Sequence, residues 1–284
     1  MLNAVAFTAL RLPLWVWKFN SCKISTRGKF IMNITGSNEM PIKKYELAGF
    51  YVEEFLSLDS TNSYLKRCSN CIQGQAAAIA YEQTAGRGRL GRSFFSSGGL
   101  YMSLMLRGVA VRYAHLLTPC SAVIVARAIE KLGAHHAGIK WVNDIYIDEK
   151  KVCGILCETK PKGAALDYAI VGIGVNLKEP KGGFPKEIKN LAGAAFNDPP
   201  EELRGKLASE IINSFSEIEA VLSSRKFIDE YRERSILIGR NIEIVSDDKI
   251  IPARVLGIDD ECRLIAETAG GTRKIFTGEV SLRL

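Results

Sequence analysis

The sequence predicts an α+β protein in two parts, a larger part of strands and amphipathic helices and a small β-barrel at the C-terminal end. Three observations predict it. Strand-like and helix-like runs both occur up to about residue 235, whereas only short strand-like runs follow Gly239. A length of 284 residues suits one large and one small domain, and 47% apolar residues suffice for a sizeable core. We therefore expect domains at 45–235 and 238–284, preceded by an extension at 1–40.

Five strand-like runs predict the strands of the larger domain. They are Ala76–Tyr81, Leu100–Leu106, Ile145–Ile147, Val152–Cys157 and Tyr168–Val175. A first helix is expected at Thr61–Arg67, with Ser60 or Asp59 as its N-cap. A second helix begins with the N-cap and N1 pair Thr118-Pro119 and ends where Gly133 supplies the C′ residue.

A third, longer helix is expected after Asp198-Pro199-Pro200, because the apolar residues that follow keep helical spacing and form one stripe. The stripe consists of Leu203, Leu207, Ile211, Phe215, Ile218 and Leu222. Residues 226–236 predict one more helix.

After Gly239, turn signals such as Asp247-Asp248, Asp259-Asp260 and Gly270-Gly271 separate short strand-like runs. The expected strands are Ile242–Val245, Ile251–Gly257, Arg263–Glu267, Thr272–Phe276 and Glu279–Leu282. Five strands in about 45 residues predict the small barrel, with a domain boundary near residues 235–240.

The net charge of +7 does not by itself indicate a nucleic-acid partner, because it is concentrated at one end of the chain. Residues 1–38 contain no acidic residue and five basic ones, which leaves +2 for the rest; the five are Arg11, Lys18, Lys23, Arg27 and Lys29. Seven cysteines in a chain of this length do not form a secreted disulfide framework. Cys68 and Cys71 have the spacing of half a zinc site, but no second such pair exists, so we expect reduced thiols in a reducing compartment.

Residues 1–38 leave three interpretations open. The apolar run Leu10–Phe19 is too short to span a bilayer, and no obvious small-residue cleavage site accompanies it. The segment is basic, free of acidic residues and contains Ser and Thr, as organelle transit peptides do. Because Met32 and Met40 follow it, a disordered extension from an upstream start is favoured over a targeting segment and over a folded element.

The most informative segment is the run QTAGRGRLGR at residues 83–92, in which glycine alternates with arginine after an apolar strand. Glycine lets a backbone approach a ligand closely, and arginine presents a planar charged group suited to phosphate or carboxylate. The run is not GxxxxGK[ST], so a phosphate-binding P-loop is not supported. A surface turn or an RNA-binding patch is the alternative, but the near-neutral body favours a loop that closes over an anionic ligand.

A second segment, KWVND at residues 140–144, leads into a hairpin that returns through Lys151 and Gly154. An ammonium group at Lys140 or Lys151 could stabilise charge on a phosphoryl group, although lysine near a turn is ordinary in hairpins. Strict alternation along the return strand would place Lys151 and Cys153 on one face and Val152 and Gly154 on the other.

Two weaker segments complete the pattern. GIGVN at residues 172–176 ends an apolar strand, where tight packing explains both glycines. DSTN at residues 59–62 is explained by helix capping, and the same short polar groups could also bind the polar head of a neutral ligand.

In this order and spacing the four segments resemble the biotin–protein ligases, in which DSTN precedes a GRGRxGR loop, a KWPND hairpin with its lysine and a GxGxN strand. The resemblance extends from about Phe50 to Leu284. It implies a mixed-sheet α+β catalytic domain like that of class II aminoacyl-tRNA synthetases and an SH3-like C-terminal barrel. It also implies an enzyme that joins biotin to ATP as biotinyl-5′-adenylate, with Mg²⁺, and passes biotin to a lysine of a biotin carboxyl carrier protein.

The resemblance assigns roles to residues at matching positions, with Lys151, Arg87 and Arg89 as catalytic groups. The expected biotin-binding residues are Ser60, Thr61, Asn62, Gln83, Arg87, Gly88, Arg89, Lys151 and Gly154. The expected ATP- and adenylate-binding residues are Gly86, Arg87, Gly88, Arg89, Arg92, Phe94, Lys140, Asn143 and Asn176. Mg²⁺ ligands are not indicated. Val142 replaces the family's common proline, and Phe94 replaces a tryptophan that often follows the loop.

The N-terminal helix-turn-helix of ligases that double as repressors is not evident in the 45 or so residues before the catalytic domain. We therefore expect the ligase-only form, a monomer or homodimer without a specific nucleic-acid or membrane partner. The expected location is the cytoplasm, with organellar targeting by residues 1–38 as the alternative. Rival interpretations are a biotin-responsive DNA-binding regulator and a lipoate–protein ligase or octanoyltransferase, which share the core fold.

Overall fold

A computed structural model of the chain describes residues 22–24, 30–32, 39–92, 94–95, 97–246, 249–276 and 279–282. Residues 1–38 form a unit separate from residues 39–284. Within the first unit, β1 (Cys22–Ile24) pairs antiparallel with β2 (Phe30–Met32). The rest of the expected extension at residues 1–40, apart from residues 39 and 40, lies outside the described residues.

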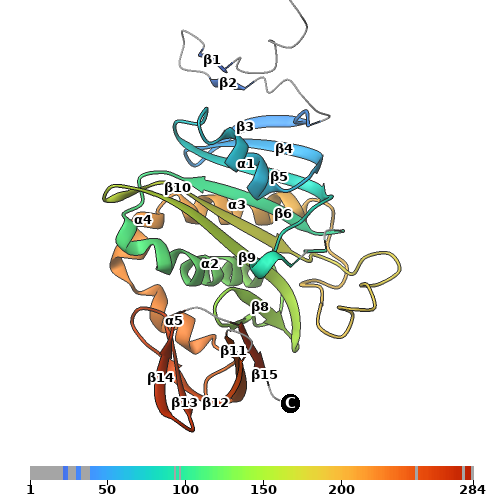
Figure 1. Cartoon of the computed structure of the whole chain (residues 1–284). Coiled ribbons are helices and arrows are strands. Elements are labelled where there is room, and N and C mark those ends of the chain that lie inside the picture. Colours follow the sequence, from blue (N-terminus) through green and yellow to red (C-terminus); the bar gives the residue numbers. More distant parts are fainter. Residues whose placement is uncertain are drawn as a thin grey trace, which may run out of the picture. The chain divides into compact units, whose positions relative to one another are not determined.

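The larger domain is built on an eight-stranded mixed sheet with the order β3-β4-β5-β6-β10-β9-β8-β7 (Figure 1). The strands are β3 (Lys43–Leu47), β4 (Phe50–Leu58), β5 (Gln75–Gln83), β6 (Leu100–Leu106), β7 (Gly138–Lys140), β8 (Asp144–Ile147), β9 (Lys150–Lys162) and β10 (Ala165–Val175). β4 and β5 run parallel, and the other neighbours run antiparallel. The five expected strands of this domain are confirmed; β3, β4 and β7 were not expected.

Helices cover both faces of this sheet. They are α1 (Thr61–Cys68), α2 (Leu117–Lys131), α3 (Leu203–Phe215), α4 (Ile218–Ser224) and α5 (Phe227–Glu233). On β9, Glu158 bonds to Asn62 of α1, whereas the side chain of its neighbour Cys157 lies beside Thr118 and Ser121 of α2. Because successive side chains of a strand point to opposite faces, α1 and α2 lie on opposite sides of the sheet.

Two helix predictions need correction. Residues 111–116 form a 3-10 helix that runs directly into α2, so Thr118 lies inside the helix and is not its N-cap. The expected third helix is two helices, since α3 ends before Ser216, whose hydroxyl bonds to Asn213 O at 2.7 Å. The apolar stripe nevertheless remains buried across the break. The other end of α2 is as expected, because Gly133 has φ +98° and donates its N–H to Glu130 O.

The C-terminal region forms a second, antiparallel sheet with the order β14-β13-β12-β11-β15. Its strands are β11 (Asn241–Ser246), β12 (Lys249–Ile258), β13 (Leu264–Thr268), β14 (Gly271–Ile275) and β15 (Glu279–Leu282), so all five expected strands are present. The expected turn at 247–248 lies outside the described residues. This sheet supports the KWVND segment, because the buried indole of Trp141 donates to Cys262 O at 2.9 Å.

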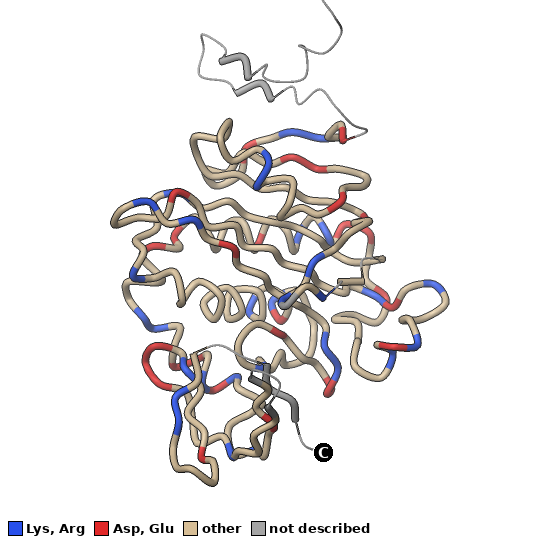
Figure 2. Tube along the Cα trace, in the orientation of Figure 1, with Lys and Arg blue, Asp and Glu red and all other residues tan. Residues whose placement is uncertain are grey.

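Charged residues of both signs are interspersed along residues 39–284 (Figure 2), in keeping with the small net charge of this part. Among the described residues, no helix is both long and apolar enough to cross a membrane.

Candidate active site

One pocket of about 1080 Å³ gathers all four sequence segments. It lies on the face of the sheet that carries α1, and it is lined by residues of the Gly-Arg loop, the β8–β9 hairpin and β10. Of the residues predicted to bind ligand, all but Gly86 line it. These are Ser60, Thr61, Asn62, Gln83, Arg87, Gly88, Arg89, Arg92, Phe94, Lys140, Asn143, Lys151, Gly154 and Asn176.

The start of α1 forms one end of the pocket. Ser60 is the N-cap, and its hydroxyl accepts the N–H of Ser63 at 3.5 Å. The next residue, Thr61, donates its backbone N–H to Gln83 Oε1 at 2.9 Å and so ties the helix to the end of β5. Capping therefore holds three short polar side chains, Ser60, Thr61 and Asn62, in fixed positions against the pocket.

The Gly-Arg loop is folded by its own backbone. Residues 89–91 form a 3-10 turn, which is closed by the bond from Arg92 N–H to Arg89 O at 3.2 Å. The flanking residue Gly88 donates its N–H to Arg92 O at 2.7 Å. Gly86 is buried beneath the loop and accepts the N–H of Phe94 at 2.8 Å, which explains its absence from the pocket lining. Arg87 and Arg92 are exposed and line the pocket, and Arg87 also lies 4.0 Å from Glu158 Oε1.

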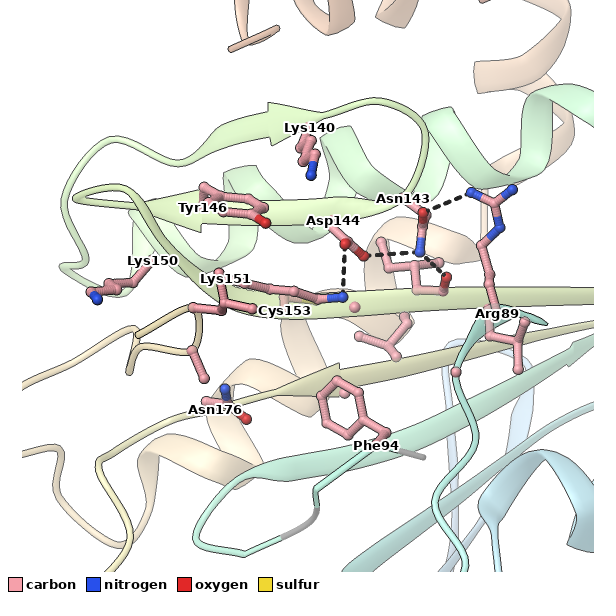
Figure 3. Close-up of a pocket in the computed structure, with 18 of the residues that line it drawn as sticks. Arg89, Phe94, Lys140, Asn143, Asp144, Tyr146, Lys150, Lys151, Cys153 and Asn176 are labelled. Carbon is pink, nitrogen blue, oxygen red and sulfur yellow. Dashed lines mark hydrogen bonds and ion pairs between the residues drawn. The ribbon is translucent and has the colours of Figure 1, made fainter. Parts of the chain in front are cut away.

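A polar chain crosses the pocket from the loop to the hairpin (Figure 3). Arg89 donates to Asn143 Oδ1 at 3.1 Å, and Asn143 donates to Asp144 Oδ1 at 2.9 Å. The other oxygen of Asp144 lies 2.7 Å from Lys151 Nζ. Two cations from different segments are thus held at the same carboxylate–amide pair, and a phosphate placed between them would meet both charges.

The face on which Gly154 lies differs from the prediction. The pairing of β8 with β9 shifts from Ile145–Cys153 to Tyr146–Lys151, which leaves Val152 as a bulge residue. Because a bulge interrupts the alternation of side chains, Lys151 and Gly154 lie on the same face. A Cβ atom at Gly154 would be 3.4 Å from Lys151 Nζ. Both residues therefore line the pocket together, as Cys153 also does.

Phe94 lies over two glycines of neighbouring strands. Gly154 of β9 and Gly174 of β10 are cross-strand partners. A Cβ atom at Gly174 would be 2.6 Å from Phe94 Cε1, and one at Gly154 would be 3.1 Å from Phe94 Cε2. The second glycine of GIGVN is therefore required by close approach of an aromatic ring that borders the pocket.

The segment after β10 and the end of β7 also line the pocket, with Phe184, Ile188, Asn190, Leu191, Ala192 and Lys140. Lys140 Nζ lies 6.0 Å from the centroid of the Tyr146 ring. Lys151 donates its backbone N–H to Leu191 O at 2.7 Å, and Asn176 Nδ2 donates to Gly193 O at 3.0 Å. The segment after GIGVN is thereby fixed beside the hairpin lysine.

Residues 54–176 match the model of the biotin/lipoate A/B protein ligase family, and residues 237–283 match the biotin protein ligase C-terminal domain. The biotin–[acetyl-CoA-carboxylase] ligase of Paracoccus denitrificans is 31% identical over 241 residues, which cover 78% of this chain and 96% of that protein. The chain belongs to the biotin protein ligase family.

Two further members of the family extend the comparison. The bifunctional ligase/repressor BirA of Bacillus subtilis is 32% identical over 211 residues, or 72% of this chain. The match spans 65% of that protein, just under two thirds of its length. The biotin protein ligase from Aquifex aeolicus in complex with biotin and ATP has a TM-score of 0.67 at 28% identity, with 82% of this chain and 98% of that chain covered.

Several residues in or next to the pocket were not predicted from the sequence. Asp144 belongs to the KWVND segment, but only its contact with Lys151 shows its place in the polar chain. Glu158, which bonds to Asn62, and Ser103, which bonds to Thr61 and Asn62, lie in strands and have no distinctive local pattern. Residues 184–192 also line the pocket without any recognisable motif.

The described residues contain no group of three His, Cys, Asp or Glu side chains placed to hold a metal ion. The six cysteines whose side chains are described are free thiols. Cys68 and Cys153 are buried, and burial raises the pKa of the Cys68 thiol to about 12.

Proposed function

We propose that this chain is an ATP-dependent biotin protein ligase, which forms biotinyl-5′-adenylate and transfers the biotinyl group to a lysine of a biotin carboxyl carrier protein. The observation that carries the proposal is the meeting of all four motif segments in one pocket, in a chain of the biotin protein ligase family. A homologue of similar fold carries both biotin and ATP, and the relative that this chain spans almost fully is named as a biotin–[acetyl-CoA-carboxylase] ligase.

The start of α1 and Gln83 would hold the polar head of biotin, because these side chains offer neutral donors and acceptors at a partly buried end of the pocket. The Gly-Arg loop would cover the phosphate side. Arg87, Arg89 and Lys151 would face the reacting carboxylate and the α-phosphate.

In the first step a carboxylate oxygen of biotin attacks the α-phosphorus of ATP, and pyrophosphate leaves. Negative charge grows on phosphate oxygens, and Lys151 and Arg89 stand at the polar chain where they can stabilise it. In the second step the neutral amine of a carrier lysine attacks the acyl carbon, AMP leaves with the bonding electrons and the amine loses a proton. The closed loop would exclude water from the anhydride between the steps.

Mg²⁺ belongs to this proposal as part of the ATP substrate. Mg²⁺ is commonly held by substrate phosphates, waters and one or two carboxylates, and so needs no dedicated protein cage. The described part of the pocket lining includes four carboxylates, those of Asp144, Asp148, Glu149 and Glu233, of which Asp144 is paired with Lys151.

The carrier is proposed to be a domain of a biotin-dependent carboxylase. The free thiols of the described residues suit a reducing compartment, so we propose a cytoplasmic location, with targeting by residues 1–38 as the alternative.

Pyrophosphate release tests the function directly. Purified chain with ATP should release pyrophosphate in the presence of biotin, and should do so far more slowly with lipoate or octanoate. Addition of a carrier domain should then yield biotinylated lysine. Faster turnover with lipoate or octanoate than with biotin would contradict the proposal and favour the other branch of the biotin/lipoate family.

A further inference from the structure

Two residues of the KWVND segment are held by partners that lie outside the pocket lining. The indole of Trp141 donates to the backbone carbonyl oxygen of Cys262, in the turn between β12 and β13, at 2.9 Å. The backbone carbonyl oxygen of the next residue, Val142, accepts a hydrogen bond from the hydroxyl of Tyr231 on α5 at 3.1 Å. Neither Val142 nor Tyr231 lines the pocket, so this second bond is a contact behind the site.

Tyr231 is well placed to act as a fixed donor. Its side chain is fully buried, and the neighbouring Arg232 fastens α5 to the C-terminal sheet by donating to Ile258 O at 2.8 Å. Burial raises the pKa of the Tyr231 hydroxyl well above its usual range, so the group keeps its hydrogen at neutral pH. The hydroxyl therefore acts on Val142 as a donor.

The bond to Val142 restrains the backbone of the next residue, Asn143. The carbonyl of Val142 and the N–H of Asn143 belong to one planar peptide unit, so Tyr231 fixes the orientation of the unit that leads into Asn143. The unit that leaves Asn143 is fixed by β9, because Asn143 O accepts the N–H of Ile155 at 3.0 Å. Together the two bonds hold both backbone dihedrals of Asn143.

The side chain of Asn143 is the point where the hairpin holds the Gly-Arg loop (Figure 3). Its Nδ2 donates to Asp144 Oδ1 at 2.9 Å and to Ile155 O at 3.0 Å, so Oδ1 is the atom left to accept the bond from Arg89 at 3.1 Å. The charges of Arg89 and Asp144 also act on the pKa of Tyr231, which places its hydroxyl within electrostatic reach of this contact. A rotation of the Asn143 backbone would break the bond to Arg89.

We propose that Tyr231 is a positioning residue, whose hydroxyl holds Asn143 in the orientation that receives Arg89 and so keeps the Gly-Arg loop over biotinyl-adenylate. The inference rests on the proposed function, because it concerns retention of the intermediate that this function requires. Tyr231 acts through Val142 and Asn143 and touches no ligand. If it only packed the core, loss of its hydroxyl would lower stability and leave the loop unaffected.

The test measures how fast biotinyl-adenylate leaves the full chain. Labelled intermediate is formed from labelled biotin and ATP without carrier, and excess unlabelled biotinyl-adenylate is then added. Asn143→Ala deletes the acceptor for Arg89 and should raise the dissociation rate about tenfold, the size expected for loss of one charge-assisted hydrogen bond. Tyr231→Phe keeps the buried ring, removes only the hydroxyl and should raise the rate by about fivefold.

The double variant Asn143→Ala/Tyr231→Phe tests the route. If Tyr231 acts through Asn143, the double variant should release the intermediate no faster than Asn143→Ala alone. Tyr45→Phe is the matched control, because it also removes a tyrosine hydroxyl, one that bonds to Glu54 on the outermost strand β3 and does not line the pocket. It should release the intermediate at the wild-type rate.

The rate is measured on preformed complex, so a partly unfolded variant cannot imitate faster release. A wild-type rate in Tyr231→Phe would overturn the inference. So would a double variant in which Tyr231→Phe speeds release by the same factor as it does alone. Both outcomes would leave the proposed function intact, whereas a wild-type chain that forms no biotinyl-adenylate would overturn the proposed function and this inference with it.

Discussion

Lys151 and Asp144 form an ion pair across the β8–β9 hairpin, with 2.7 Å between Nζ and Oδ2 (Figure 3). Asp144 also accepts a hydrogen bond from Asn143, which is itself bonded to Arg89. The carboxylate therefore holds the ammonium group in the pocket and links it to the Gly-Arg loop. A phosphate that binds here would compete with Asp144 for the Lys151 ammonium group. Because that group is already held in the pocket, it needs little rearrangement during the reaction.

The first prediction concerns Lys151. Lys151→Ala should slow pyrophosphate release by on the order of 10²–10³-fold, because one preorganised donor to the developing charge is lost. Supplying biotinyl-adenylate should restore most carrier labelling, since the second step does not build that charge again. Lys140→Ala is the control for a general loss of positive charge in the pocket. An adenylation rate of Lys151→Ala close to that of the wild type would show that this lysine has no catalytic role.

The second prediction concerns Arg87, which is exposed at the pocket rim. Arg87→Ala should make biotinyl-adenylate dissociate faster, because a charge-assisted contact to phosphate is worth about 1.5–3 kcal/mol. The released intermediate would label free amines in solution, which a blot for biotin on bystander protein can detect. Arg112→Ala removes an arginine that does not line the pocket and serves as the control. Bystander labelling no greater than that of the wild type would contradict the role of the loop.

The third prediction concerns Gly174. Gly174→Ala should destabilise the chain by roughly 1–3 kcal/mol and disturb adenylate formation, because its Cβ would overlap the Phe94 ring. Adding Phe94→Ala should recover part of that stability in the double variant, as measured by urea unfolding. Gly205→Ala in α3 is the matched control, since it meets nothing within 4 Å and should be neutral or stabilising. Additive effects of the two substitutions would show that the ring and Gly174 are not coupled.

The fourth prediction concerns the N-terminal segment. Deletion of residues 1–38 should leave ligation and thermal stability unchanged, because every pocket residue lies in the unit formed by residues 39–284. Starting at Glu39 retains its ion pair with Arg67 at 2.9 Å. Loss of biotin-dependent pyrophosphate release in this truncation would show that the segment is part of the catalytic domain.

The fifth prediction concerns acid stability. Hydrogen bonds from Arg234 lower the pKa of Glu130 from 4.5 to about 2 and join α2 to the segment after α5. The folded pKa is depressed, so the stability contributed by this carboxylate is present above about pH 4.5 and is lost as the pH falls toward about 2. Glu130→Gln should therefore be less stable than the wild type at pH 7, with the difference shrinking through that window. Glu187→Gln, at an exposed position outside the helices, is the matched control for the substitution itself.

Features that depend on near neighbours in the chain could be predicted from the sequence. The Ser60 cap, the strand Leu100–Leu106 and the end of α2 at Gly133 follow from side chains within a few residues of each other. The same holds for the positive charge that QTAGRGRLGR brings to the pocket. The missed strand Gly138–Lys140 has only three residues, too few for a periodic pattern to distinguish.

What the sequence determined by itself was the family, the set of polar and charged groups and the segments that carry them. Their pairing was decided by the tertiary structure. Asn62 meets Glu158 across 96 residues and Ser103 across 41, and each contact depends on strand register in the sheet. The bulge at Val152 that brings Gly154 beside Lys151 depends on how β8 pairs with β9. Local spacing cannot encode such contacts, because the free energy that selects a register comes from the whole buried face and not from the residues that happen to meet there.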